Sequence, residues 1–137
     1  MQVGGDTLGY DSLSAALADL PSDNNVITLL KNIDLGAQVS VPANSGAATI
    51  TAAENEDGTP IEITWENATA SFFNIPSGAA LTVSGNIIIR GTESTGQRAF
   101  DVAGTLNFGE ASSASQYPMV EQFDLSTEKG IAAVYVN

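Results

Sequence analysis

The sequence predicts an all-β fold in which short parallel strands coil into a stack, a parallel β-helix of about four rungs. Three observations favour this class. A unit of strand, small-residue corner and strand recurs along the chain, Gly and Pro separate short apolar runs, and Asp57-Gly58 is the only Asn-Gly or Asp-Gly pair of the kind that makes a two-residue hairpin. A unit that returns at a regular interval is typical of a coil whose rungs stack on one another.

The recurring unit is clearest around two phenylalanines. Phe72-Phe73-Asn74-Ile75 precedes a Pro-Ser-Gly-Ala corner, and Ala99-Phe100-Asp101-Val102 precedes an Ala-Gly-Thr corner. A looser copy covers residues 39–51. Because like side chains stack on like in such a coil, we expect these pairs to lie in register: Phe73 with Phe100, Ile75 with Val102, Leu81 with Leu106, and Asn74 with Asp101.

The chain begins with its one predicted helix, over residues 12–20. Its apolar residues follow the i, i+3, i+4, i+7 spacing of one helical face: Leu13, Ala16, Leu17 and Leu20. Asp11 or Ser12 is a suitable N-cap, and Pro21 ends the helix. We expect the apolar face to cover the open first rung.

Residues 26–108 are predicted to form the rungs. Short β-branched or alternating runs lie at 26–30, 33–35, 39–41, 48–51, 61–66, 72–75, 81–83, 87–89, 99–102 and 106–108. The cleanest alternation, at 61–66, directs Trp65 to the same side as Ile61 and Ile63. Residues 109–130 are predicted to be loop or a short helix, with one helical turn around 119–123, and residues 131–136 a last strand.

Composition bounds the size and the partners of the protein. A chain of 137 residues with 43% hydrophobic residues fits one domain, residues 1–137. Sixteen acidic and four basic residues give a net charge of -12, which disfavours nucleic acid and anionic membranes as partners. No apolar run approaches the length of a membrane helix, so we expect no membrane insertion. Met1 leads directly into Gln2-Val3-Gly4-Gly5, without a signal peptide. Either the protein is cytosolic or the chain is a fragment of a longer protein, and we expect the fragment.

A family resemblance rests on the N-terminal third. Gly9-Tyr10-Asp11-Ser12-Leu13, followed by Asn25-Val26-Ile27-Thr28-Leu29-Leu30, resembles the opening of pectate-lyase-like right-handed parallel β-helix modules of bacterial cell-surface and adhesin-like proteins. The end of the chain, 130–137, resembles the start of a further rung. The resemblance implies a right-handed coil whose first rung is closed by an amphipathic helix. It is least typical at residues 110–129.

Catalytic groups of the enzymes in that superfamily have no counterpart here. Those enzymes use a basic residue with calcium-binding aspartates, or an aspartate trio with His and an Arg/Lys pair. This chain has neither His nor Cys, and Arg90 is read as a strand-end charge that reaches water. We therefore expect no enzyme activity, no catalytic residue and no cofactor.

Two groups of residues are candidates for ligand binding. Glu54, Glu56 and Asp57 form the densest acidic run and are weak candidates for calcium, although the register of an EF-hand fails. Trp65, Thr92, Glu93 and Arg98 are candidates for a glycan site: Trp65 through ring stacking, and the others on a bulge between rungs. For each group, a structural role is the alternative: an exposed acidic loop, a core-directed ring and a simple loop.

The functional expectation is a non-catalytic extracellular or cell-surface module, a structural stalk or a unit that presents ligands for adhesion. Its partners would be a glycan, or a host or matrix protein. The alternatives are the N-terminal part of a polysaccharide-active enzyme and a glycan-binding module. In the binding alternative, the loop at 54–60 and the bulge at 92–98 form a glycan or host-protein site on one side of the coil. Because Val134-Tyr135-Val136-Asn137 ends the chain without a polar cap, we also expect weak end-to-end self-association if the last rung is uncovered.

Overall fold

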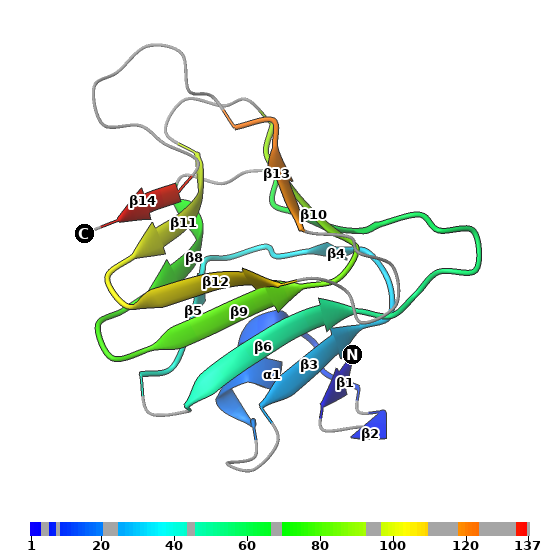
Figure 1. Cartoon of the computed structure of the whole chain (residues 1–137), viewed down its shortest axis with the longest axis horizontal. Helices are drawn as coiled ribbons and strands as arrows, with labels where there is room; N and C mark the ends of the chain where they lie inside the picture. Colours follow the sequence, from blue (N-terminus) through cyan, green and yellow to red (C-terminus); the bar gives the residue numbers. More distant parts are fainter. Residues whose placement is uncertain are drawn as a thin grey trace.

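The computed structural model describes residues 1–3, 6–7, 9–20, 25–43, 46–66, 70–92, 97–109, 118–123 and 134–136. Its strands form three sheets (Figure 1). Sheet A holds β12 (Thr105–Gly109), β9 (Ala80–Ser84), β6 (Ala47–Ala52), β3 (Val26–Leu29), β1 (Gln2–Val3) and β2 (Asp6–Thr7), in spatial order. Sheet B holds β13 (Met119–Glu121), β10 (Ile87–Arg90), β7 (Ile61–Thr64) and β4 (Ile33–Asp34). Sheet C holds β14 (Val134–Val136), β11 (Arg98–Val102), β8 (Ser71–Ile75) and β5 (Val39–Ser40).

From β3 onward, the chain visits the three sheets in a fixed order. Each circuit, as we call one passage through sheets A, B and C, adds one strand to each sheet: β3–β4–β5, β6–β7–β8, β9–β10–β11 and β12–β13–β14. All pairs between successive circuits are parallel. The prediction of an all-β fold with parallel sheets is therefore confirmed.

Register follows the recurring sequence unit. The expected pairs are observed: Phe73 with Phe100, Ile75 with Val102, Asn74 with Asp101 and Leu81 with Leu106. The rings of Phe73 and Phe100 stack with their centroids 5.2 Å apart. The looser copy also lies in register, since Val39 pairs with Phe73 and Ile50 with Val83. Repetition in the sequence thus becomes a set of side-chain columns that run from circuit to circuit.

The core is enclosed by the three sheets. Alternation along β3, β7 and β9 buries every second side chain, as on β7, where Ile61 and Ile63 are inside. Strand β8 departs from alternation because Ser71, Phe72 and Phe73 are all buried. The partner of Ser71 is Gln38, whose Nε2 donates to the Ser71 hydroxyl over 2.8 Å and to its carbonyl oxygen over 3.0 Å.

The single helix of the described residues, α1 (Leu13–Ala18), packs on the first circuit, where it contacts β5. Figure 1 shows it beside β3 and β6, at the end of the molecule opposite β13 and β14. Leu13, Ala16 and Leu17 are buried in the same core as the strands, and Leu20 is partly buried against it. Ser12 is the N-cap, and its hydroxyl accepts the Ala15 N–H over 3.1 Å. The predicted stop at Pro21 lies outside the described residues.

Two parts of the prediction need correction. The helical turn expected around residues 119–123 is wrong: Met119–Glu121 is strand β13, which pairs in parallel with Ile88–Arg90. The backbone hydrogen bonds that β10 offers to residues 119–121 outweigh the helical pattern of residues 119–123, which contains only three apolar residues. Strands β1 and β2 were also not predicted; they extend sheet A beyond β3 and pair in the antiparallel sense. Of the last predicted strand, 131–136, the structure describes 134–136 as β14, and 131–133 lie outside the described residues.

Corners of very different length connect the same two sheets. From sheet A to sheet B, β9 reaches β10 through Gly85 and Asn86 alone, whereas β6 reaches β7 through residues 53–60. Ile61 and Ile87 nevertheless remain paired. The side-chain amide of Asn86 donates to the carbonyl oxygen of Gly58 over 3.0 Å, which ties the short corner to the long one.

Candidate functional site

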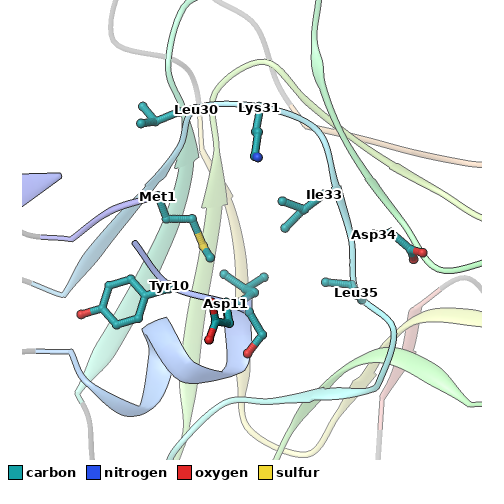
Figure 2. A pocket seen from close by; sticks show the side chains of 10 residues that line it. Met1, Tyr10, Asp11, Leu30, Lys31, Ile33, Asp34 and Leu35 are labelled. Carbon is teal, nitrogen blue, oxygen red and sulfur yellow. The ribbon is translucent and has the colours of Figure 1, made fainter. Parts of the chain in front are cut away.

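A cavity of about 190 Å³ lies at the N-terminal end, between the start of α1 and residues 30–35. Figure 2 shows Lys31 and Ile33 pointing inward toward Met1 and the helix, whereas the Asp34 carboxylate points away. Leu13 and Leu35 also line the cavity, so much of its wall is apolar. The cavity therefore combines the Lys31 ammonium group and the polar side chains of Asp11 and Ser12 with aliphatic side chains.

Tyr10 stands at the edge of this cavity and is already engaged. Its hydroxyl donates to Oδ2 of Asp19 over 3.0 Å, linking the segment before α1 to the residue that ends it. Partial burial, together with this hydrogen bond and the charge of Asp19, raises the pKa of Tyr10 above its ordinary value. At neutral pH the phenol is protonated and serves as a structural donor.

The acidic run at residues 54–58 lies in a loop that is held by internal hydrogen bonds. The Asp57 carboxylate accepts the Thr59 hydroxyl over 2.7 Å and the Thr59 N–H over 3.0 Å. The Asn55 side chain donates to the Thr59 carbonyl oxygen over 2.7 Å. Hydrogen bonds from Thr59 lower the pKa of Asp57. The Asp57 carboxylate is thus occupied within its own turn.

The calcium candidates do not converge. Across the described part of the chain, no group of three or more acidic, His or Cys side chains has an arrangement that could hold a metal ion. Glu54 and Glu56 are exposed, and Asp57 faces Thr59. Calcium at these residues stays a prediction without a preformed cage.

The glycan candidates lie largely at one corner, between sheets B and C. Trp65 follows β7 and Thr92 follows β10, and the two strands are paired with Arg90 opposite Thr64. Arg98 opens β11 on the other side of the corner and is half-buried. Glu93 lies outside the described residues. The structure brings Trp65 and Thr92 to successive circuits of the same corner.

Each described member of this corner also has structural contacts. Trp65 is partly buried and meets Phe72 edge-on, with ring centroids 5.9 Å apart, as its alternation predicts. The N–H and hydroxyl of Thr92 approach Oε1 of Gln97 at 2.8 and 3.2 Å. Gln97 itself is fully buried. The Trp65 ring is therefore already engaged with Phe72 and the core.

The acidic loop and this corner are separated. Residues 53–60 join sheet A to sheet B, before β7, whereas Trp65 and Thr92 follow β7 and β10. A four-residue strand spans about 13 Å. The acidic loop and the glycan candidates therefore flank opposite ends of sheet B, and a single small ligand does not reach both.

One charged cluster was missed by sequence reasoning. Arg90, expected to extend into water, is only 31% exposed and bridges two carboxylates. Its Nη2 lies 2.8 Å from Glu62 Oε1 and its Nη1 lies 2.9 Å from Glu121 Oε1. The signal was present in the spacing, because Glu62 and Arg90 are separated by nearly the interval of the Phe73–Phe100 repeat. One guanidinium is thus shared by two carboxylates, and the cluster, with a net charge of -1, joins three strands of sheet B.

Comparisons with family models, curated proteins and solved structures find no match to this chain. No helix in the described ranges has the length and apolar character that crossing a membrane requires.

Proposed function

We propose that this chain is a right-handed parallel β-helix and a non-catalytic structural module of an extracellular or cell-surface protein. The observation that carries the proposal is the constancy of register under corners of unequal length, as at Ile61 and Ile87. Stacked strands that keep their register while the connecting segments differ in length can hold loops at a distance from the point where the protein is attached to the cell. The resemblance to adhesin-like β-helix modules supports the same role and the right-handed coil.

The test combines an activity panel with surface labelling. The chain, incubated with pectins, alginates and glycosaminoglycans, should yield neither unsaturated products nor new reducing ends. Antibodies against the folded module should label intact cells that express the parent protein. Turnover that disappears in Arg90→Ala or Arg98→Ala would establish the alternative, a polysaccharide-active enzyme, and labelling only after lysis would refute the surface location.

A second candidate function is glycan binding at the corner of sheets B and C. It is favoured by one observation, the placement of Trp65 and Thr92 on successive circuits beside Arg98. A glycan and matrix-protein array decides between presentation and binding. Binding that is lost in Arg98→Gln but survives exchange of residues 54–58 for a short neutral turn would locate the site at this corner. The opposite pattern, with calcium dependence, would locate it at the acidic loop.

A further inference from the structure

The columns of core side chains that run along sheet A are partly exposed in the last circuit, on β12. Leu81 and Val83 on β9 are fully buried, but their register partners on β12 are not. Leu106 is only partly buried and Phe108 is 41% exposed, although both point to the side that is interior one circuit earlier. Phe108 meets Phe100 edge-on, with ring centroids 5.7 Å apart, and presents the rest of its ring outward. In the part of the chain that the structure describes, no further strand of sheet A covers this end of the core.

The same end also carries an unpaired strand edge. In the described residues β12 is the last strand of sheet A, and its strand partner is β9. The Thr105 N–H donates to the Ala79 carbonyl oxygen over 3.0 Å, toward the β9 side. Because backbone N–H groups alternate in direction along a strand, those of Leu106 and Phe108 point away from β9. Groups of this kind are a template for an added strand.

Charge indicates which strand can be added. The net charge of -12 makes most approaches between two copies repulsive. Strand β12, however, contains no charged residue, and the carboxylate of Glu121 on β13 is paired with Arg90, which it shares with Glu62. Strand β12 also lacks the Lys or Pro that commonly protects an edge. The edge of β12 can thus meet an identical edge without setting the charged side chains of the two strands opposite one another, since β12 has none.

We propose that two copies of this chain pair through β12, antiparallel and around a two-fold axis at Asn107. This register sets Leu106 opposite Phe108 of the second copy, so that the free N–H and C=O groups of both residues form hydrogen bonds. The Leu106 and Phe108 side chains of the two copies then cover one another. The pairing joins the two A sheets into one and is independent of the structural role proposed above.

Asn107 provides a sharp test, because its side chain is exposed on the outer face and leaves the core untouched. In the proposed pair, it lies opposite its own copy at a non-hydrogen-bonded position, where side chains are closest. Sedimentation equilibrium should show a monomer–dimer equilibrium for the wild type, strengthened by salt. Asn107→Lys and Asn107→Asp should each raise the dimer Kd at least tenfold. An equimolar mixture of the two variants should recover the dimer, since opposite charges then face each other.

Thr82→Lys is the matched control. Thr82 is the register partner of Asn107 on β9 and shares its outer face. Two copies of residue 82 are about three strand spacings apart, roughly 14 Å, beyond the screening length of about 8 Å at physiological salt. Thr82→Lys should therefore dimerise nearly as the wild type does, and circular dichroism checks that each variant folds. A monomeric wild type at the highest soluble concentration, or a mixture of Lys and Asp variants no more dimeric than either alone, overturns the proposal.

Discussion

Nη1 of Arg90 lies 2.9 Å from Oε1 of Glu121, and this ion pair fastens β13 to the circuit before it. Strand β13 has three residues, of which Met119 is 50% exposed, so it buries little apolar surface of its own. It is attached by the ladder with β10, by Arg90, which also binds Glu62 on β7, and by Phe123 just beyond the strand, which is buried against Phe72. One guanidinium therefore links three circuits of sheet B.

Arg90→Gln should lower the free energy of unfolding by about 1–2 kcal/mol, because it removes two partly exposed ion pairs that form one network. Chemical denaturation measures the change, and it should shrink at high salt. A double-mutant cycle with Glu121→Gln should show positive coupling. Lys31→Gln, which removes an exposed cation elsewhere, should change stability by less than about 0.5 kcal/mol; equal effects of the two substitutions would contradict the network.

Leu17→Asp should destabilise the fold by several kcal/mol or prevent soluble expression. Leu17 is 1% exposed in the core that α1 shares with the first circuit, and the substitution places an unpaired charge there. Ser14→Asp is the control, since it adds the same charge to the exposed side of the same helix. A thermal melt of Leu17→Asp that matches the melt of Ser14→Asp would show that α1 does not close the core.

Gly104→Ala should destabilise by about 1–3 kcal/mol through overpacking. A Cβ atom at Gly104 would overlap the carbonyl oxygens of Ala79 and Pro76, which belong to the corner one circuit earlier. Gly9→Ala is the comparison, because no atom lies within 4 Å of the added carbon. Similar denaturation midpoints for both variants would mean that successive corners do not stack as closely as the structure shows.

Asp57→Asn should reveal a pH-dependent contribution of the acidic loop. The pKa of Asp57 is lowered in the folded state, so its ionised form stabilises the fold above the ordinary aspartate pKa of about 3.9. That contribution is lost as pH falls through the lowered value. The stability difference between wild type and Asp57→Asn should therefore be present at neutral pH and vanish in strong acid. A difference that grows on acidification would reverse the sign expected from the Thr59 hydrogen bonds.

Sequence reasoning succeeded where the determinant is local. The alternation of Ile61 and Ile63, and the spacing of Leu13, Ala16 and Leu17, each reflect which side of one element faces the core. The Phe73–Phe100 register followed from repetition, because neighbouring circuits place equivalent side chains above one another. These features give the sheets, the helix and most of the core.

Features that depend on distant partners were not predicted. Strand β13 exists because β10 offers a ladder, and Met119-Val120-Glu121 alone carries little strand signal. Arg90 was judged by its own position at a strand end, whereas its environment is set by Glu62 and Glu121. The separation of the acidic loop from Trp65 likewise required knowing which sheets each corner joins.

The unequal lengths of the corners between sheets A and B indicate that a foreign peptide can be inserted at the longer corner, residues 53–60. Gly85 and Asn86 complete in two residues the passage that residues 53–60 make one circuit earlier, and Ile61 and Ile87 stay aligned. The longer segment can therefore change in sequence while β7 and β10 keep their register, at the cost of the contacts that Asp57 makes with Thr59. A library displayed at residues 54–58 would vary recognition while the stacked columns beneath it keep a constant geometry.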